Sequence, residues 1–575
     1  MMPSIINLLT AAFATASLAS GALSKKQPNI VFILTDDQDV EMNSLDYMPL
    51  LHKYVINEGT LFDRHYCTVA ICCPSRVNLW TGRAAHNTNV TDLFPPYGGY
   101  PVFVREGLND DWLPVWLQQE GYNTYYTGKL FNAHSVETYN DPPVNGFNGS
   151  DFLLDPYTYE YYNGHMTRNG APPVSYKGQY SPDVVAEKAY GFLDEAVLHP
   201  EPFFLGIAPI APHSNVQFSV SPPVMDTAFY APRHAHLFKD YKIPRTANFN
   251  PEKPSGVGWV KALPRLNDTV VEYNDEFQRS RLRALQSVDE MVETLVQKLE
   301  AHGVLNNTYI FYTTDNGYHI GQHRLHPGKE CAFETDIHIP LAVRGPKVPV
   351  GHVAGLVSSH SDLSPTLMKL AGKERLDLDG LAIPLTKEEL NAKDHHEHVN
   401  VEFWGRAIPE GRYGKIGNDT GTPGLGDPIP KFARNNTYKA LRINSNAYNL
   451  LYVFTEVLEC ELTPSSSTHT KSTTSSTRKP KSLRSRTSLL VDLSTRSCHA
   501  PWETLHKDGK VKTLAQALDS DYDDFYAGQP KVAFDSCQMG YLVEHEGPQR
   551  VNTWSSRDPY AGSEQQPMGH WSWYT

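Results

Sequence analysis

The sequence lacks several features that would point to particular classes of protein. Basic residues are in the minority, with 51 lysines and arginines against 64 aspartates and glutamates, and the formal net charge is −13. This acidic balance argues against nucleic acid as a partner. Only seven cysteines occur in 575 residues, so three disulfides can form but none is required. Beyond residue 22 no apolar stretch is long enough to span a bilayer, which predicts no stable membrane insertion.

The N-terminal segment has the character of a secretory signal, although no lysine or arginine precedes its apolar run. Residues 5–22 are apolar and rich in Ala, Ser and Thr, and they end in small residues. A membrane anchor is the alternative, but this composition favours a signal peptide, residues 1–22, cleaved near Ala22. N-glycosylation sequons support a secreted or secretory-pathway protein (extracellular, periplasmic, cell-wall or vacuolar), and they begin at Asn89, Asn148, Asn267, Asn306, Asn418 and Asn435.

The length is large for a single core, so we expect two domains. Apolar runs at 29–35, 123–127, 202–210, 308–314 and 339–346 read as strands, and helical spacing is found at 112–119, 280–303 and 362–372. This alternation predicts an α/β domain over residues 27–378, whose strands are buried on both faces. Beyond Leu378 the alternation fades, and strands at 399–404 and 437–443 indicate a smaller C-terminal subdomain, residues 379–575.

One segment of the C-terminal half differs in kind from the rest. Residues 463–490 are rich in Ser, Thr and basic side chains and contain no acid. Such a composition cannot bury a core, so we expect disorder there. A loop insertion and a mistranslated stretch such as a retained intron are both open explanations.

The most unusual stretch is residues 71–83, which reads ICCPSRVNLWTGR. A proline two residues after Cys72 opens a helix or a turn. A helix that begins at Pro74 would direct its free N–H groups and the positive end of its dipole toward Cys72, and this favours an anion there. Arg76 and Arg83 add positive charge near the same end. A lone cysteine before a helix is usually structural, but the whole pattern is far more specific.

Acidic and amide side chains follow two of the predicted buried strands. Asp36 and Asp37 come directly after the strand at 29–35, and Asp315 and Asn316 follow the strand at 308–314. In open α/β sheets, ligands are held at the carboxyl ends of the strands. An exposed acidic turn and an Asn-Gly turn are the simpler alternatives. Taken together, the four side chains fit a hard cation held by oxygen ligands.

The pattern Cys72-x-Pro-Ser-Arg followed by Thr-Gly-Arg resembles the signature of the type I sulfatases, in the alkaline-phosphatase-like superfamily. Residues 321–334 resemble the second signature of that family, with Phe333-Glu334 where Tyr-Glu is usual. The end of the chain resembles the tails of secreted fungal arylsulfatases. The resemblance covers most of 29–549 and implies a large mixed, mostly parallel sheet sandwiched by helices, with a smaller C-terminal α+β domain.

The resemblance also implies roles for individual residues. Cys72 would be oxidised to formylglycine (3-oxoalanine) by a formylglycine-generating enzyme, whereas Cys73 stays a cysteine. One Ca²⁺ per subunit, with Mg²⁺ as the lesser alternative, would be bound by Asp36, Asp37, Asp315, Asn316 and an oxygen of the Cys72-derived residue. Arg76 would orient that residue, Lys129 and Lys329 would clamp sulfate oxygens, and His213 would protonate the leaving oxygen. Taken alone, Lys129 also fits a solvated surface lysine and His213 a turn residue.

One position departs from the family pattern. Where the family often has Lys-x-His, this chain has Lys129-Leu130-Phe131, and Asn132 matches the Lys-x-x-Asn version of glucosamine-6-sulfatase-like members. His134 lies close by in sequence and is a candidate substitute for the missing histidine. The base that collapses the intermediate is left unassigned.

The function implied is hydrolysis of aryl sulfate esters through a formylglycine-hydrate nucleophile and a covalent sulfo-enzyme. Alternatives are an N-acetylglucosamine-6-sulfatase-like enzyme, a phosphodiesterase or phosphonate hydrolase of the same superfamily, and an inactive secreted glycoprotein that binds sulfated glycans. The partner is then a small-molecule or glycan sulfate ester. Substrate choice is expected to lie in loops at 94–108 and 141–178, which are rich in Tyr, Pro and Gly.

Overall fold

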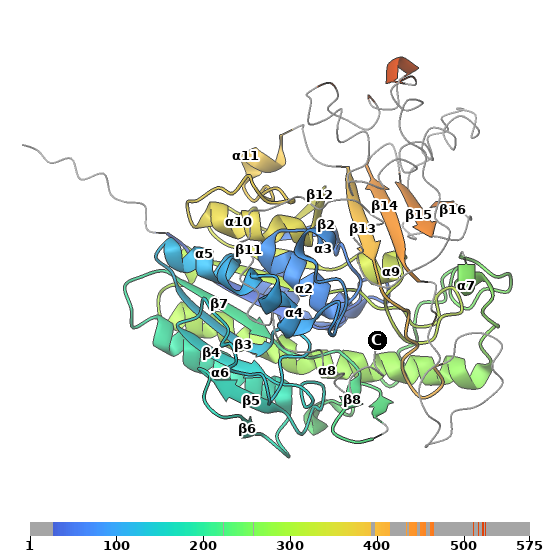
Figure 1. Cartoon of the computed structure of the whole chain (residues 1–575), viewed down its shortest axis with the longest axis horizontal. Coiled ribbons are helices and arrows are strands. Elements are labelled where there is room, and N and C mark those ends of the chain that lie inside the picture. The colour runs from blue at the N-terminus through green and yellow to red at the C-terminus, as the bar shows by residue number, and fades with distance from the viewer. Residues whose placement is uncertain are drawn as a thin grey trace, which may run out of the picture.

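The computed structural model describes most of the chain up to residue 464 (Figure 1). The described residues are 27–221, 223–256, 258–392, 397–414, 433, 436–445, 449–455, 461–464, 510, 516, 520–522 and 524. The predicted signal peptide, the sequons at Asn418 and Asn435, and the Ser/Thr-rich segment beyond residue 464 lie outside them. The division of the chain at residue 378 stays a prediction.

A ten-stranded sheet forms the centre of the molecule, with the strand order β12-β2-β11-β10-β1-β7-β3-β4-β5-β6. Its inner strands β10, β1, β7, β3 and β4 are all parallel, whereas β11, β5 and β6 run antiparallel to their neighbours, and the edge pair β12–β2 is parallel. The strands are β1 Asn29–Thr35, β2 Thr60–Tyr66, β3 Asn123–Lys129, β4 Gly149–Leu153, β5 His165–Arg168, β6 Val174–Ser175, β7 Phe203–Ala208, β10 Thr308–Thr314, β11 Leu341–Arg344 and β12 His352–Ser359. The predicted α/β class with a mixed, mostly parallel sheet is confirmed.

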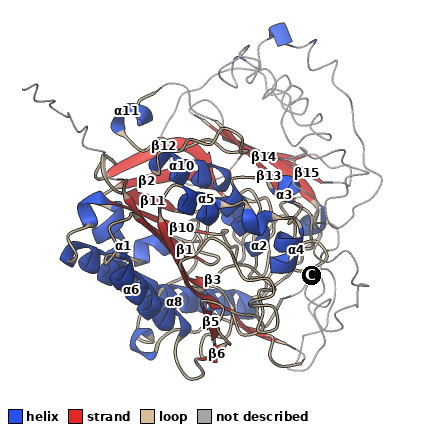
Figure 2. Cartoon of the chain, turned by 60° about the vertical axis from the view of Figure 1, so that its left-hand side comes forward, coloured by secondary structure: helices blue, strands red, loops and turns tan. Residues whose placement is uncertain are grey.

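Helices cover both faces of this sheet (Figure 2). Successive residues of a strand face opposite sides of the sheet, so a strand of apolar residues needs a hydrophobic layer on each side. On β1, Ile30, Phe32 and Leu34 belong to one hydrophobic core, and Val31 and Ile33 to the other. The first core is completed by α2 Cys72–Thr81, α4 Gly99–Arg105, α5 Leu113–Gln119 and α10 Leu363–Leu370, and the second by α1 Pro49–Leu51, α6 Ser181–Ala196 and α8 Asp268–Ala301.

A second sheet of four antiparallel strands lies beside the first (Figure 1). Its strands are β13 His398–Phe403, β14 Tyr438–Asn444, β15 Asn449–Thr455 and β16 Glu461–Pro464. Val401, Phe403 and Tyr438 pack against Tyr66 and Ile71, which lie at the end of β2 and directly before α2. This contact places the C-terminal sheet next to the start of α2.

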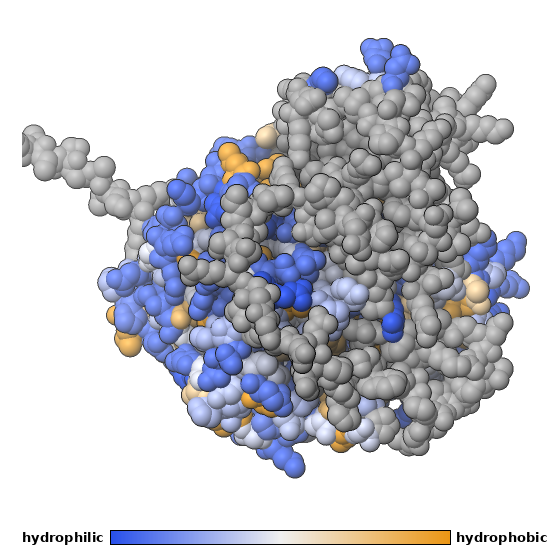
Figure 3. Space-filling view, in the orientation of Figure 1, coloured by the Kyte–Doolittle hydropathy of each residue, from blue (hydrophilic) through white to orange (hydrophobic). Residues whose placement is uncertain are grey.

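The smaller elements connect these layers. They are the helices α3 Ala85–Thr88, α7 Gly258–Lys261, α9 Glu334–Ile337 and α11 Lys387–Leu390, and the two-stranded ribbon of β8 Asn215–Gln217 and β9 Val224–Asp226. On the face seen in Figure 3, the described surface is mainly hydrophilic and its apolar residues are scattered. Among the described residues, no helix combines the length and the hydrophobicity needed to cross a bilayer.

Two helices begin earlier than predicted. The helix expected from residue 280 starts at Asp268, where the Asn267 side chain accepts a hydrogen bond from the Val270 N–H. The helix expected to open at Pro74 starts at Cys72 itself, after an extended Ile71. Cys72 is therefore the first helical residue of α2, rather than a residue outside the helix end.

The cysteines described in the structure are Cys67, Cys72, Cys73 and Cys331, and each is buried and free. Cys460, Cys498 and Cys537 lie outside the described residues.

Candidate active site

The strand ends at the centre of the sheet bring the predicted site residues together. Asp36 and Asp37 follow β1, and Asp315 and Asn316 follow its neighbour β10. Lys129 is the last residue of β3. These strands are parallel, so their carboxyl ends meet at one edge of the sheet, where ligands of open α/β folds bind.

Helix α2 places Cys72 in the middle of this group. The Cys72 Sγ lies 3.5 Å from Asp36 Oδ1, 3.9 Å from Asp37 Oδ1 and 3.1 Å from Lys329 Nζ. Burial raises the pKa of the Cys72 thiol well above its ordinary value, even though Lys129 and Lys329 act in the opposite direction. The unmodified thiol is therefore protonated at neutral pH and is a poor nucleophile.

Cys73 points away from this group and into the first hydrophobic core. Burial raises the pKa of its thiol to about 12. The two adjacent cysteines thus occupy opposite environments, one polar and one apolar.

The Arg76 guanidinium contacts residues at the carboxyl ends of three strands, β10, β3 and β1. Its Nε donates to Asp315 Oδ2 at 2.8 Å, its Nη1 donates to the Lys129 carbonyl at 2.7 Å, and its Nη2 lies 3.6 Å from Asp36 Oδ2. A fully buried guanidinium is tolerated only when it is paired in this way. Arg76 consequently fixes the positions of the carboxylates relative to α2.

Each of the two lysines forms an ion pair with one aspartate. Lys129 Nζ is 2.6 Å from Asp36 Oδ2, and Lys329 Nζ is 2.6 Å and 2.7 Å from the two carboxylate oxygens of Asp37. Burial by itself raises the pKa of Asp36, but Lys129, His213 and Arg76 outweigh it and hold the pKa at about 2. Burial also opposes ionisation of Asp37, yet Lys329 and His213 bring its pKa below the ordinary value. Both carboxylates are ionised at neutral pH.

The acidic and amide oxygens offer a place for a divalent cation. Ligand atoms of Asp36, Asp37, Cys72 and His213 lie within 4.8 Å of one another. The Asn316 Nδ2 donates to Asp37 Oδ1 at 2.8 Å, whereas the buried Asn316 Oδ1 has no hydrogen-bond partner among the described residues. An orphaned amide oxygen beside two carboxylates fits a hard cation such as Ca²⁺ or Mg²⁺. The sulfur of Cys72 does not suit such an ion, but it marks the position that an oxygen of an oxidised residue 72 would take.

His213 and Lys129 share an aromatic neighbour, Tyr159, which sequence analysis did not single out. The Tyr159 ring stacks on the His213 ring at 4.2 Å between centroids, and Lys129 Nζ lies 4.6 Å from its centre. The Asn132 Nδ2 donates to the Tyr159 hydroxyl at 2.8 Å. Tyr159 comes from the 141–178 segment, where substrate-determining residues were expected, but no motif distinguishes it there from the other tyrosines.

The orientation of His213 follows from its hydrogen bond. The carbonyl of Ser214 lies 2.8 Å from Nδ1, so Nδ1 carries a proton and donates. Nε2 faces Asp37, 3.5 Å from Oδ2. The ring therefore presents Nε2 to the centre of the site.

Phe131 and His134 lie outside this arrangement. Phe131 packs on Phe103 in the first core, at 4.6 Å between ring centroids. His134 is buried between Tyr100 and Phe152, and burial lowers its pKa to about 4. Neither side chain has a hydrogen bond or ring contact with the site residues described above, so His134 does not take the place of the missing family histidine.

Four of the predicted glycosylation sites are within the described residues. Asn148, Asn267 and Asn306 are exposed, and Asn89 is half-buried, with its Nδ2 donating to Glu106 Oε1 at 3.0 Å. Three of the four side chains are therefore accessible to a glycan in the folded protein.

Comparisons with known proteins show the family of this chain. The family model described as Sulfatase matches residues 28–373. The chain is 35% identical to an arylsulfatase of Volvox carteri, over 90% of this chain and 83% of the relative. It is also 35% identical to an arylsulfatase of Chlamydomonas reinhardtii (96% of this chain, 87% of the relative), and 31% identical to the human N-acetylglucosamine-6-sulfatase (77% and 81%).

Solved structures share the fold at lower identity. One, described as a complex with its substrate D-glucosamine-2-N,6-O-disulfate, has a TM-score of 0.58 at 21% identity, and the match covers 88% of this chain and 99% of that one. A phosphonate monoester hydrolase from Silicibacter pomeroyi has a TM-score of 0.52 at 19% identity, with 77% and 90% covered. The chain belongs to the sulfatase family, and its homologues support a sulfuric ester hydrolase activity.

Proposed function

We propose that this protein is an arylsulfatase that hydrolyses sulfate monoesters to an alcohol or phenol and sulfate. The observation that carries the proposal is the position of Cys72. It lies at the first turn of α2, within 4 Å of two ionised aspartates and a lysine. Lys129 and Lys329 beside this point, together with a divalent cation held by the aspartates, would suit a sulfate group, whose charge is spread over its oxygens.

In this proposal residue 72 is the nucleophile once it has been oxidised by a formylglycine-generating enzyme. As a hydrated aldehyde it supplies a hydroxyl group in place of the protonated thiol. A bound Ca²⁺, or less favourably Mg²⁺, supplies Lewis-acid stabilisation of negative charge on the sulfuryl oxygens. Asp36, Asp37, Asp315 and Asn316 would hold this ion.

The remaining residues of the site bind the substrate and move its proton. Lys129 and Lys329 neutralise the sulfate oxygens, and each is held by an aspartate, so that little reorganisation is needed. His213 presents Nε2 to the centre of the site, and in its doubly protonated form it donates the Nε2 proton to the leaving oxygen and keeps the proton on Nδ1. Arg76 holds the carboxylates in place relative to residue 72. Asn132 contributes to substrate binding indirectly, through its hydrogen bond to Tyr159.

A second candidate substrate is a 6-sulfated amino sugar. Its support is Asn132, which matches the version found in glucosamine-6-sulfatase-like members, together with relatives of that name at 31% identity. A comparison of 4-nitrophenyl sulfate, N-acetylglucosamine 6-sulfate and bis(4-nitrophenyl) phosphate as substrates separates these candidates from a phosphodiesterase. Higher kcat/KM for the phosphate diester than for both sulfates would contradict the proposal.

The modification of residue 72 is tested directly by mass spectrometry. The tryptic peptide 65–76 contains Cys72 and Cys73. In protein made in a host with the modifying enzyme, we expect loss of one sulfur from this peptide, at position 72. Active protein that carries only unmodified cysteine in this peptide would rule out the mechanism.

Substitution of the two adjacent cysteines gives an independent prediction. Cys72→Ala abolishes turnover of 4-nitrophenyl sulfate, because the nucleophile is lost. Cys73→Ala removes only a core side chain and retains much of the activity. Initial rates of the two purified variants, normalised to folded protein by circular dichroism, check the difference. Equal loss in both variants would count against the assignment of Cys72.

We also propose that the protein passes through the secretory pathway and carries N-linked glycans. The support is the N-terminal apolar segment and the exposure of Asn148, Asn267 and Asn306. Treatment of the secreted protein with an N-glycosidase should lower its apparent mass.

A further inference from the structure

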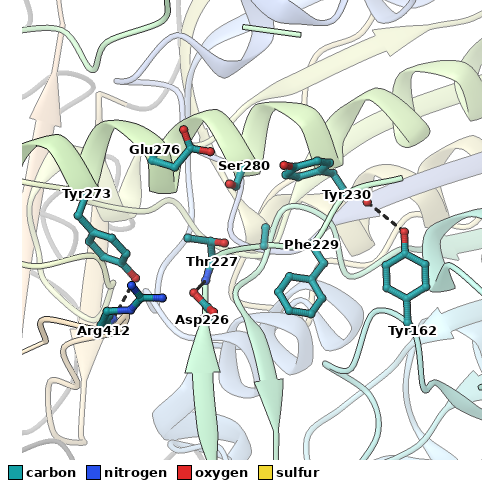
Figure 4. Close-up of a pocket in the computed structure, with 10 residues that line it drawn as sticks. Tyr162, Asp226, Thr227, Phe229, Tyr230, Tyr273, Glu276, Ser280 and Arg412 are labelled. Atoms are coloured by element: carbon teal, nitrogen blue, oxygen red, sulfur yellow. Dashed lines mark hydrogen bonds between the residues drawn. The ribbon is translucent and has the colours of Figure 1, made fainter. Parts of the chain in front are cut away.

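A second hollow opens beside α8, away from Cys72. It is a pocket of about 440 Å³ between α8, the end of β9 and the segment around Arg412 (Figure 4). Its walls combine aromatic residues with polar ones: Tyr162, Phe229, Tyr230 and Tyr273, and Asp226, Thr227, Glu276, Ser280 and Arg412.

Two of the four aromatic rings of this pocket, those of Tyr162 and Tyr273, are held by hydrogen bonds. The Tyr162 hydroxyl donates to the Tyr230 carbonyl at 3.0 Å, and the Tyr273 hydroxyl accepts from the Arg412 N–H at 2.9 Å. All four rings are half-buried. They line the pocket instead of filling it.

Two charged groups of the pocket are available to a ligand. Asp226 Oδ1 accepts from the Thr227 N–H at 2.8 Å, and neither Asp226 nor the Arg412 guanidinium is in an ion pair within the described part of the chain. The other charged group of the pocket, Glu276, is already paired with Arg279 and Arg283. The remaining carboxylate and guanidinium, beside aromatic faces, suit a molecule with apolar C–H faces and a rim of hydroxyls. A pyranose ring has both features.

The pocket and the candidate active site share the segments that build them. Tyr162 follows Tyr159 by three residues, and Asp226 on β9 is paired with Asn215 on β8, two residues after His213. Arg412 follows Glu410, which accepts a hydrogen bond from the hydroxyl of Ser214, next to His213. Backbone spacings over such short segments place the two sites on the order of 10 Å apart. A single chain-like substrate can therefore reach both.

We propose that this pocket is a subsite for a pyranose ring of a glycan whose neighbouring unit carries the sulfate ester. The inference rests on the proposed sulfatase function and adds that the substrate is an oligosaccharide, not a small aryl ester. The net-neutral pair of Asp226 and Arg412 favours an uncharged sugar ring at this position over a second sulfated one.

Chain-length dependence of kcat/KM tests the proposal. The substrates are 4-nitrophenyl sulfate, N-acetylglucosamine 6-sulfate, and a disaccharide and a tetrasaccharide that end in the same sulfated unit. We expect an oligosaccharide to exceed the monosaccharide by about tenfold or more in kcat/KM, mainly through KM. Tyr230→Ala should lower this ratio by about fivefold or more, because a stacking face is lost. The ratio cancels any loss of folded enzyme.

A matched control is another half-buried tyrosine, Tyr54, in the helical segment His52–Ile56. Its hydroxyl donates to Glu293 on α8, which is more than three turns from the pocket. Tyr54→Ala should leave the ratio unchanged. Asp226→Asn, a conservative change at a partly exposed position, should lower the ratio less than Tyr230→Ala does, and it replaces that variant should the latter fold poorly.

The outcomes separate this inference from the proposed function. Turnover of 4-nitrophenyl sulfate without any preference for the longer saccharides would overturn the subsite alone. A Tyr230→Ala effect on the aryl ester but not on the saccharides would overturn its assignment to a sugar. Absence of turnover for every sulfate ester, in protein shown to carry the modified residue 72, would overturn the proposed function and the subsite with it.

Discussion

Tyr159 contacts three residues that we assign to substrate binding, namely His213, Lys129 and Asn132. Its ring holds a cation and an imidazole at fixed distances, so we treat it as a positioning residue. Cation–π contacts that are shielded from water contribute about 2 kcal/mol, which is enough to decide where the Lys129 ammonium group lies.

Substitution of Tyr159 tests this role. Tyr159→Leu should lower kcat/KM for 4-nitrophenyl sulfate by about tenfold, since both ring contacts are lost. Tyr159→Phe keeps the ring and loses only the bond to Asn132, so it should recover most of the activity. The matched control is Tyr157→Leu, because Tyr157 stacks on His165, at 3.8 Å, instead of on a site residue. Similar losses in Tyr157→Leu and Tyr159→Leu would contradict the positioning role.

Substitution of Asn316 tests the binding of the cation separately from catalysis. Its Oδ1 is buried without a partner, so Asn316→Ala should weaken Ca²⁺ binding by at least about tenfold. The measurement is the rise in melting temperature of the chelator-treated protein as Ca²⁺ is added, which needs no substrate. Asn274→Ala is the control, because Asn274 is equally buried with unpartnered amide atoms but lies on α8. A Ca²⁺ response that is unchanged in Asn316→Ala would remove Asn316 from the ligand set.

At the residue scale, the sequence predicted groups that follow a recognisable strand and missed those in loops. Asp36 and Asp315 could be placed because a continuous apolar run ends immediately before each of them. Tyr159 could not, because its partners come from β3 and from the residues after β7, and only the fold brings them together. His134 was near Lys129 in sequence, yet its ring turns into the aromatic core.

At the scale of elements, α8 shows why a helix start can be hidden. Its first turns bury Asn274, Asp275 and Gln278, which are polar. Gln278 Nε2 donates to Asp39 Oδ1 at 2.8 Å, and Asp275 Oδ1 accepts from the Ile243 N–H at 3.0 Å. A buried face that is largely polar weakens the apolar period that a sequence pattern can detect. The predicted helix therefore begins only at residue 280, where leucines recur at helical spacing.

An ion pair joins the C-terminal sheet to the catalytic layer. Arg442 on β14 donates from Nε to Glu334 Oε2 at 2.7 Å and from Nη2 to Glu334 Oε1 at 3.0 Å. Glu334 begins α9, a few residues after Lys329. This bidentate contact therefore connects the second sheet to the segment that carries Lys329, to which we assign substrate binding.

Arg442→Ala should destabilise the protein by about 3–5 kcal/mol, since it leaves a largely buried carboxylate unpaired. The measurement is the urea midpoint, combined with hydrogen exchange of peptides from β13 and β14. Arg375→Ala is the matched control, because Arg375 also forms a bidentate pair, with Asp377, but that carboxylate is exposed and the expected cost is about 1 kcal/mol or less. Equal destabilisation by the two changes would show that the Arg442 contact adds nothing specific.

For the molecule as a whole, buried neutral histidines predict a loss of stability in acid. Burial lowers the pKa of His134 to about 4, whereas an unfolded histidine titrates near pH 6.5. As the pH falls from about 6.5 to about 4, the unfolded chain takes up a proton that the folded chain does not. Stability is therefore lost through that interval, by up to about 3 kcal/mol for this residue, and no further loss follows below it.

His134→Phe isolates this contribution, because phenylalanine fits beside Tyr100 and Phe152. The variant should lose less stability than the parent protein between about pH 7 and about pH 5, measured by urea unfolding. Buried carboxyl groups such as Glu330, whose pKa burial raises, act in the opposite direction and cancel in this comparison. His199→Gln, at an exposed position, should leave the difference unchanged. A parallel pH profile for His134→Phe and the parent would refute the assignment.

The seclusion of Cys72 has a consequence for how the protein is made. Only 2% of this residue is exposed, and it is enclosed by the strand ends and by the start of α2. A maturation enzyme needs an accessible, extended peptide around its target. If residue 72 is oxidised as we propose, the oxidation must accordingly precede folding, while the nascent polypeptide is still open. Molecules that close before being processed would stay inert for their lifetime, however much maturation enzyme they meet afterwards.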